Sequence, residues 1–346
     1  IFIGLGVGPL FFGPLSDSLG RKPMVFVGFG IFILASFICV YAKSLEIMVL
    51  GRILQGFGLS APRTISVAII RDLYAGDYMA KIMSFVIVIF LLVPIIAPAM
   101  GKLILDSFNW EAIFIFQILF CLLIAFWFWK RQEETLDPKN RIDFKIDLFK
   151  KGFLELMHFK KTIAYTLISG LITGSFMVYL STSQQIFQEQ YGLKETFPYI
   201  FAGLATASGG AILLNGLFVV KYGMKKIINI SLIGFFLISV CYAFLFYNSV
   251  NPPLIIILSF FSLQFFCLGF LFGNLRAIAM EPVGHIAGIG AAITGFISTL
   301  MAVPISIVIG KFVRLTVLPI FIGFSICSFI SILILIVLTI KAPQNN

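Results

Sequence analysis

Long apolar blocks alternate with short polar connections along this chain of 346 residues. Most blocks hold about 18–25 residues, which is enough to cross roughly 30 Å of hydrocarbon as a helix. A single block could be a buried core helix, but such a succession argues against that interpretation. The eleven blocks are residues 1–15, 24–42, 47–70, 82–105, 111–129, 162–187, 197–220, 227–247, 253–275, 286–309 and 316–340. They predict an all-α integral membrane protein.

Composition excludes a soluble domain. Apolar residues make up 60% of the chain, charged residues only 12%, and the mean hydropathy is +1.07. A soluble domain of this length needs a charged shell that so few charges cannot form. An outer-membrane barrel would show short segments of alternating polarity, and the continuous blocks do not alternate. The protein is therefore predicted to cross an inner membrane with helices.

The net charge of +10 could suggest a nucleic-acid partner, but the basic residues follow membrane topology. If the connection at 20–22 is cytoplasmic, 18 of the 25 Lys and Arg residues lie in connections on that side and five on the other. An excess of Lys and Arg on the cytoplasmic side is typical of membrane proteins. We expect the lipid bilayer, and no nucleic acid, as a partner.

No cofactor, metal site or catalytic centre is expected. The two histidines, His158 and His285, stand apart from each other. No phosphate-binding loop of the form G-x-x-x-x-G-K-[ST] occurs, so energy for transport would have to come from an ion gradient. The cysteines lie in separate apolar blocks and are interpreted as packing residues: Cys39, Cys121, Cys241, Cys267 and Cys327.

A long polar stretch from Lys130 to Lys161 divides the apolar blocks into two sets. We predict an N-terminal helical bundle at 1–130, a cytoplasmic linker at 131–161 and a C-terminal helical bundle at 162–346. An internal repeat supports two related halves, because the segment 216–226 matches the segment 13–23 at an offset of 203 residues. Both copies would lie on the same side of the membrane, as in parallel repeats.

The connection at 13–23 carries the most specific motif. It has the pattern G-x-x-x-D-x-x-G-R-[KR], with Gly13, Asp17, Gly20, Arg21 and Lys22 at the specified positions. It resembles the loop between the second and third helices of major facilitator superfamily transporters. The resemblance implies two pseudo-symmetric six-helix bundles, so a first helix is expected to be missing here. It also implies that Asp17 latches onto the eleventh-helix region, although a solvated turn is the alternative.

The block 47–70 holds two arginines. Arg52 and Arg63 are eleven residues apart, which places them within about 20° on a helix and roughly 16 Å apart along its axis. A lipid-facing arginine near the bilayer centre costs at least ~2.5–3.5 kcal/mol, so we expect both to face a polar cavity; snorkelling is the alternative. Arg52, Gln55 and Gly56 also resemble the superfamily's fourth-helix motif, whose arginine is proposed to take part in proton transfer.

The next block contains Pro94, Pro98 and Gly101. Each proline removes one intrahelical hydrogen bond, so a bent helix is expected. The spacing resembles the fifth-helix antiporter motif of bacterial drug exporters in the same superfamily, whereas an ordinary proline kink is the alternative. The segment Glu134-Thr135-Leu136 narrows the resemblance to the bicyclomycin and chloramphenicol resistance branch.

Polar residues inside other blocks allow two interpretations. Gln117, Gln184, Gln264 and Asn274 could line a substrate cavity, or they could form hydrogen bonds between helices. With 40 phenylalanines in the chain, a cavity would be aromatic and would suit amphipathic organic molecules.

The function expected from the resemblance is proton-coupled export of amphipathic drugs across a bacterial inner membrane. A monomer would bind its substrate between the two bundles and expose it alternately on each side. A proton-coupled transporter of an ordinary metabolite and a non-transporting membrane receptor remain alternatives. A membrane-embedded enzyme acting on lipid would require clustered His, Asp or Glu residues, which the isolated histidines do not provide.

Overall fold

The computed structural model describes residues 1–74, 82, 86, 93, 96–97, 99–141, 146–248 and 251–340, and these residues form helices joined by short connections. Ten helices within these ranges are long and apolar enough to cross a membrane. The all-α membrane architecture is thereby confirmed. Half of the predicted helix at 82–105 lies outside the described residues, although 99–107 are helical.

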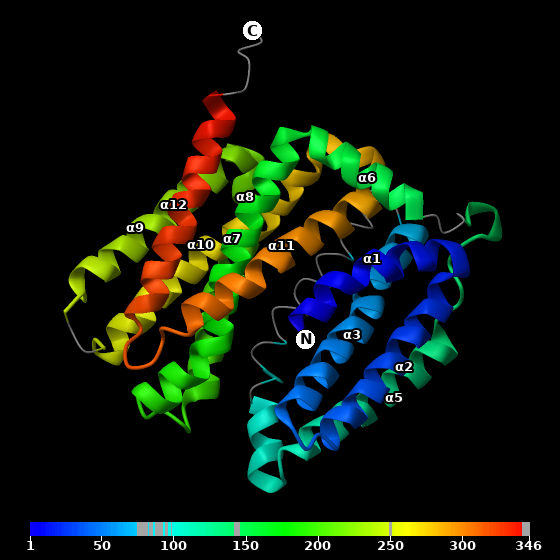
Figure 1. The fold of residues 1–346 in the computed structure, drawn as a ribbon, viewed down its shortest axis with the longest axis horizontal. Coiled ribbons are helices and arrows are strands. Elements are labelled where there is room, and N and C mark those ends of the chain that lie inside the picture. The colour runs from blue at the N-terminus through cyan, green and yellow to red at the C-terminus, as the bar shows by residue number, and fades with distance from the viewer. Residues whose placement is uncertain are drawn as a thin grey trace. The chain divides into compact units, whose positions relative to one another are not determined.

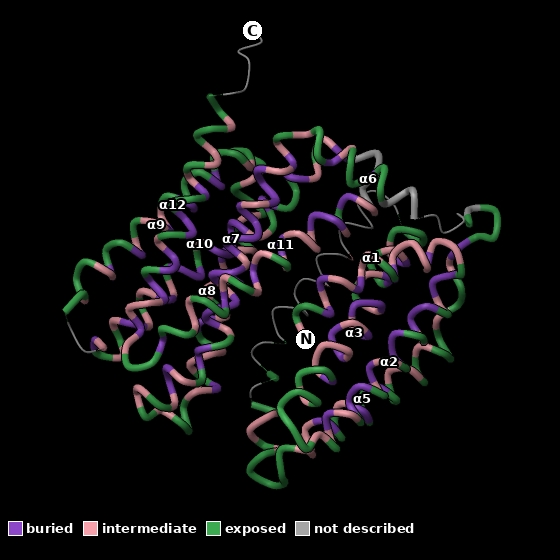
Figure 2. The backbone as a smooth tube through the Cα atoms, in the orientation of Figure 1, coloured by how far each residue is buried: buried purple, intermediate pink, exposed green. Residues whose placement is uncertain are grey.

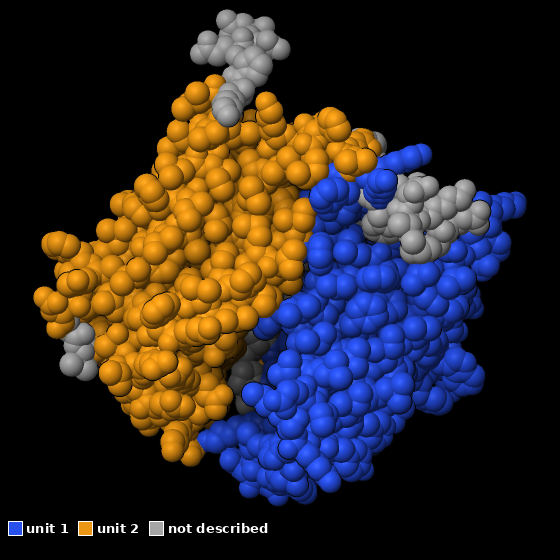
Figure 3. Space-filling model, viewed as in Figure 1, with its two compact units in different colours: residues 1–93, 97–153, 288–296 blue, residues 94–96, 154–287, 297–346 orange. Residues whose placement is uncertain are grey.

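The chain forms two compact units, coloured separately in Figure 3. Unit 1 comprises residues 1–93, 97–153 and 288–296, and unit 2 comprises residues 94–96, 154–287 and 297–346. The boundaries predicted at residues 130 and 162 stay a prediction.

Unit 1 is built around one helix that contacts two others. Its long helices are α1 (Phe2–Leu19), α2 (Arg21–Val40), α3 (Leu45–Leu73) and α5 (Glu111–Arg131), followed by η1 (Pro138–Asn140) and the start of α6 (Ile146–His158). Helix α3 packs against both α1 and α2, and α2 also packs against α5 (Figure 1). The core between them holds Phe12, Phe29, Phe32 and Ile65.

Unit 2 has the same kind of packing and a larger aromatic core. It contains α7 (Lys160–Gln184), η2 (Gln185–Gln190), α8 (Phe197–Tyr222), α9 (Met224–Leu245), α10 (Leu254–Met280), η3 (Glu281–Ile286), the later part of α11 (Ala287–Gly310) and α12 (Leu318–Ile340). Buried residues are frequent along α7, whereas α12 exposes much of its length (Figure 2). Tyr179, Phe261 and Phe321 are almost completely buried here.

The two units repeat one arrangement of helices. The contacts of α3 with α1 and α2, and of α2 with α5, have counterparts in those of α10 with α8 and α9, and of α9 with α12. The helix-to-helix turns also match, because Gly20 has φ 108° and Gly223 has φ 76°. Only glycine adopts such angles without steric cost. The sequence repeat thus corresponds to a repeated helical unit.

Close approach of the helices in unit 1 depends on small residues. A Cβ at Gly28 of α2 would lie 2.4 Å from Ala61 Cβ and 2.7 Å from the Gly58 carbonyl oxygen of α3. Lipid tails solvate apolar side chains as well as a neighbouring helix does, so association in membranes relies on such close packing. The α2–α3 contact therefore has no space for an added methyl group.

We predict that Gly28→Ala destabilises the protein by about 1–3 kcal/mol, because the new methyl group forces two backbones apart. Thermal unfolding in detergent measures the effect. Gly30→Ala is the matched control, since Gly30 lies on the same helix, is exposed, and a Cβ added to it would have no atom within 4 Å. It should be neutral or slightly stabilising. Equal melting temperatures for the two variants would contradict this account of packing.

Candidate functional site

The turn between α1 and α2 contains a buried arginine that joins three helix ends. Arg21 is only 3% exposed. Its guanidinium forms an ion pair with Asp17 and donates hydrogen bonds to Ser16 Oγ at 2.8 Å and to Asp72 Oδ2 at 2.9 Å. Ser16 and Asp17 end α1, and Asp72 ends α3. The two carboxylates neutralise a charge that would be costly to bury alone.

A third carboxylate, from the segment after α5, also contacts this turn. Glu134 Oε1 accepts a hydrogen bond from the Arg21 backbone N–H at 2.9 Å, and Glu134 Oε2 accepts one from the Lys22 N–H at 3.0 Å. These N–H groups open α2 and have no partner within the helix. The negative charge also suits the positive end of the helix dipole. Glu134 therefore ties the segment after α5 to the start of α2.

The structure brings most of the sequence motif together. Asp17, Gly20, Arg21 and Lys22 lie at one turn, and the Gly13 carbonyl accepts a hydrogen bond at 2.7 Å from Ser16 Oγ, which also contacts Arg21. Within the described part of the chain, the hydrogen bonds and ion pairs of Arg21 and Lys22 stay inside unit 1. A latch from Asp17 to the eleventh-helix region stays a prediction.

From the sequence, Arg71 and Asp72 are interpreted as a latch at a helix end, but no partner is predicted for Asp72 and no structural role for Glu134. Asp72 follows Arg71 at the end of an apolar block, which marks it as a helix-end charge, and Glu134 stands in the segment used for family resemblance. Neither sequence position indicates that its carboxylate contacts Arg21, because the contacts span 51 and 113 residues.

Within α3, Arg52 is part of a polar cluster. Arg52 Nη1 donates to Gln55 Oε1 at 3.1 Å, and the guanidinium lies 5.6 Å from the centre of the Phe114 ring of α5. Gln55 is completely buried and donates from Nε2 to Ser36 Oγ of α2 at 2.7 Å and to Gln117 Oε1 of α5 at 3.4 Å. Three helices therefore hold this side-chain amide against the arginine.

The Arg52 charge has no carboxylate beside it in the part of the chain that the structure describes: there it contacts the Gln55 amide and an aromatic ring and lies near Cys39. Arg52 is only partly buried. An amide oxygen accepts a hydrogen bond without cancelling the positive charge. The site can therefore attract an anionic group or favour the ionised form of a nearby acid.

The remaining predicted site residues are Gly56 and Arg63 of α3, followed along the chain by Pro94, Pro98 and Gly101. Gly56 is buried and packs against the first residue of the chain: a Cβ added to Gly56 would lie 2.0 Å from the Ile1 carbonyl oxygen. Arg63 is exposed, whereas Arg52, the other arginine of α3 considered for a cavity, is partly buried. Pro94 and Pro98 lie outside the described residues, and Gly101 is helical with open space around its Cβ position.

Unit 2 repeats the buried amide without the charge. Gln264 Nε2 of α10 donates to Ser239 Oγ of α9 at 2.6 Å, and Ser239 Oγ donates to the Phe235 carbonyl at 2.7 Å. In unit 1, Ser36 Oγ donates likewise to the Phe32 carbonyl at 2.7 Å. Ser239 follows Ser36 by 203 positions, the offset of the sequence repeat.

Aromatic residues replace the polar ones around Gln264. Helices α3 and α10 begin 209 positions apart, so Phe261 stands where Arg52 stands in the first copy. Phe261 is fully buried, and Phe235 packs on Phe324 of α12 at 5.2 Å between ring centres. Gln264 Oε1 is buried and has no hydrogen-bond partner among the described residues. The charged version of the cluster thus occurs in unit 1.

The four polar residues considered for a cavity have different surroundings. Gln117 joins the Arg52 cluster, and Gln264 forms a buried bond between helices. Asn274 is buried and exchanges hydrogen bonds with Asn215 of α8, at 2.7 and 3.3 Å. Gln184 is exposed and donates to Gln188 at 3.1 Å. Helix-to-helix hydrogen bonds therefore account for Gln264 and Asn274, and their role as cavity residues stays a prediction.

The sequence resembles transport and resistance proteins. A Haemophilus influenzae protein named "Bicyclomycin resistance protein homolog" is 31% identical over 66% of this chain and 58% of its own length. The Citrobacter koseri "Multidrug resistance protein MdtL" is 26% identical over 96% of this chain and 83% of its own length. The chain thus matches less than two thirds of the first of these proteins and most of the second.

A solved structure supports the fold. The crystal structure of a D-xylose-proton symporter has a TM-score of 0.72 and 14% identity, covering 96% of this chain and 84% of that one. The profile of the Major Facilitator Superfamily matches residues 1–305. With these matches and its ten apolar spans, the chain belongs to the Major Facilitator Superfamily of membrane transporters and is a multi-pass protein of the bacterial inner membrane.

Proposed function

We propose that this protein exports amphipathic small molecules by alternating access and that inward proton flow drives the export. The observation that carries the proposal is the Arg52 cluster, a guanidinium inside an apolar span that is held by an amide and lacks a carboxylate partner in the described ranges. Charged groups at membrane depth are expensive and mark functional pathways. The names of the two resistance-protein relatives support the drug class.

Proton coupling follows from electrostatics at Arg52. A fixed positive charge stabilises the ionised form of an acid that approaches it, and an apolar surrounding strengthens the effect. Protonation of such an acid would release it from the arginine, so one protein conformation would be favoured with a proton and the other without. Gln55 positions the guanidinium, because its own amide is fixed by Ser36.

The Arg21 turn would stabilise one of the two conformations. Its ion pairs connect the ends of α1 and α3, and Glu134 connects α2 to the segment after α5. Movement of these helix ends relative to each other would break contacts that are partly buried. The turn would therefore add to the energy difference between the two states without taking part in substrate binding.

A test of the proposed function uses everted membrane vesicles with an acidified lumen. Bicyclomycin, chloramphenicol or tetraphenylphosphonium is added, and proton release from the lumen is followed with a fluorescent pH probe. Release on addition of at least one compound supports the antiporter. Binding of these compounds without proton release would contradict proton coupling, and absence of any response would favour a metabolite transporter or a receptor.

We predict that Arg52→Phe abolishes drug-dependent proton release while the protein still folds. The second copy of the repeat already accommodates Phe261 at this position, so the substitution resembles a natural variant. The amount of folded protein is measured by detergent size-exclusion chromatography. Arg314→Gln, at an exposed residue, is the control for loss of one arginine and should release protons like the wild type. Normal proton release by Arg52→Phe would contradict the role of the charge.

Asp17→Asn is expected to lower the efflux rate without reducing insertion into the membrane. Arg21 keeps its contact with Asp72, so the fold survives, but the state stabilised by the turn loses an ion pair. A loss of roughly 1 kcal/mol changes the ratio of two states about fivefold. Asp137→Asn serves as the control, because Asp137 only accepts a hydrogen bond from the Lys139 N–H, and an asparagine can do the same. Efflux equal to that of the control would remove the proposed role of the turn.

A further inference from the structure

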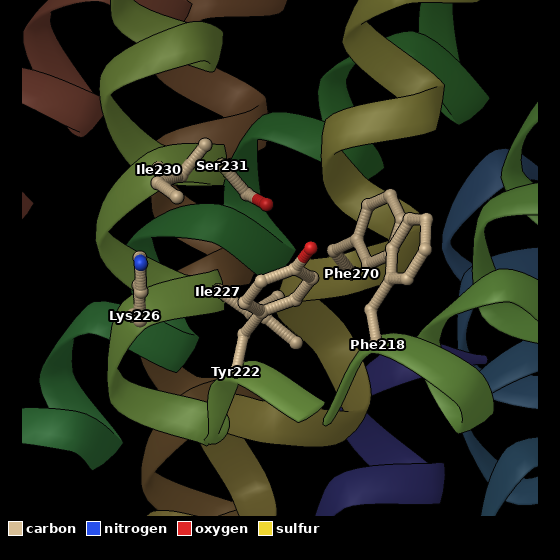
Figure 4. Close-up of a pocket in the computed structure, with 7 residues that line it drawn as sticks. All are labelled: Phe218, Tyr222, Lys226, Ile227, Ile230, Ser231 and Phe270. Carbon is tan, nitrogen blue, oxygen red and sulfur yellow. The ribbon is translucent and has the colours of Figure 1, made fainter. Parts of the chain in front are cut away.

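A small groove opens on unit 2 where α8 ends and α9 begins. It encloses about 200 Å³ and is lined mainly by apolar side chains (Figure 4). Phe218 stacks on Phe270 of α10 with ring centres 6.0 Å apart, and Tyr222 packs edge-on against Phe218. Ile227 and Ile230 of α9 continue the lining. The groove therefore offers an apolar surface suited to a hydrocarbon chain.

Lys226 lines this groove, and two further lysines lie close to it in the chain. The ammonium groups of Lys221 and Lys226 lie 5.3 and 5.4 Å from the centre of the same Tyr222 ring. Lys225 is exposed beside them. The connection at 221–226 belongs to the set of basic connections that the charge asymmetry places on the cytoplasmic side. The groove thus combines an apolar interior with a cationic rim at the level of the membrane surface.

The positive charge of the turn between α8 and α9 differs from that of the equivalent turn in unit 1. In unit 1, the carboxylates of Asp17 and Asp72 neutralise Arg21. In unit 2, Val220 stands at the position of Asp17 and is 88% exposed. Glu281 stands at the position of Asp72; its ion pair is with Lys161, and it also interacts electrostatically with Lys225.

The basic residues of the second turn are therefore not neutralised in the same way. Within the described part of the chain, no carboxylate forms an ion pair with Lys221, Lys225 or Lys226. With Val220 in place of an acid and Glu281 paired with Lys161, Lys221 and Lys226 present a cationic surface that is available to an external anion. Clusters of Lys beside apolar surface at the cytoplasmic face attract anionic lipids, at roughly 1 kcal/mol for each basic residue.

We propose that this groove, defined by Phe218, Tyr222, Lys226, Ile227, Ile230 and Phe270, binds an anionic phospholipid of the cytoplasmic leaflet. One acyl chain lies along the phenylalanine pair and the isoleucines. The phosphate group lies between the ammonium groups of Lys221 and Lys226, with the Tyr222 ring beneath them. A small inorganic anion would leave the apolar lining uncovered, so the lining favours a lipid over free phosphate.

The test measures lipid binding by the purified full chain in detergent. Dioctanoyl phosphatidylglycerol and dioctanoyl phosphatidylcholine are titrated separately, and bound lipid is counted by native mass spectrometry. We expect phosphatidylglycerol to bind at least tenfold more tightly. The double variant Lys221→Gln, Lys226→Gln should weaken its binding about 30-fold. The variant Lys221→Arg, Lys226→Arg keeps both charges and should bind like the wild type.

Lys194→Gln, Lys311→Gln is the matched control, because it removes the same charge from exposed residues on the opposite side of the membrane. It should leave phosphatidylglycerol binding unchanged. In the wild type, added salt should weaken binding of phosphatidylglycerol and not of phosphatidylcholine, a result that does not depend on any variant folding. Equal binding of the two lipids, unchanged binding by the glutamine variant, or full displacement of lipid by inorganic phosphate would each overturn the proposal.

Discussion

The proposed activity depends on one interaction, the hydrogen bond between the Gln55 amide and the Arg52 guanidinium inside unit 1. Gln55 is fully buried and is itself held by Ser36 of α2, so the arginine has a fixed place on α3. Close packing of α2 on α3 makes this geometry possible, because Gly28 and Gly58 let the two backbones meet. The close contact between α2 and α3 thus also positions the Arg52 charge.

The repeat separates structural from functional features of this device. Gln264, Ser239 and Phe235 in unit 2 reproduce the hydrogen bonds of Gln55, Ser36 and Phe32, so the amide–serine pair belongs to the helical unit itself. Arg52 and Gln117 have no polar equivalent around Gln264, where phenylalanines fill the space. The basic turns also differ, since Asp17 of unit 1 is replaced by Val220 in unit 2, and Glu281, at the position of Asp72, forms its ion pair with Lys161. Charge compensation, more than helix packing, therefore distinguishes the two copies.

The membrane-spanning helices and the family could be predicted from the sequence. Apolar block length indicated the spans, and the motifs indicated the family, because both depend on residues close together in the chain. The partners of Arg21 could not be predicted, since Asp72 and Glu134 reach it from distant segments. The surroundings of Gln264 could not be predicted either, because a glutamine in an apolar span has the same local pattern whether it faces a cavity or a neighbouring helix. The exposures of Arg52 and Arg63 also differ despite their similar azimuth, since Arg52 is partly buried and Arg63 is exposed.

The most direct test of the proposed proton coupling counts protons when the purified protein binds a drug. Bicyclomycin is added to the protein in weakly buffered detergent solution, and a pH indicator follows proton release between about pH 6 and pH 8. If drug binding brings an acid that is protonated while apart from Arg52 against the guanidinium, the positive charge ionises that acid, and binding releases protons from the wild type within this range. Saturable binding of bicyclomycin with no proton release at any pH would contradict the account.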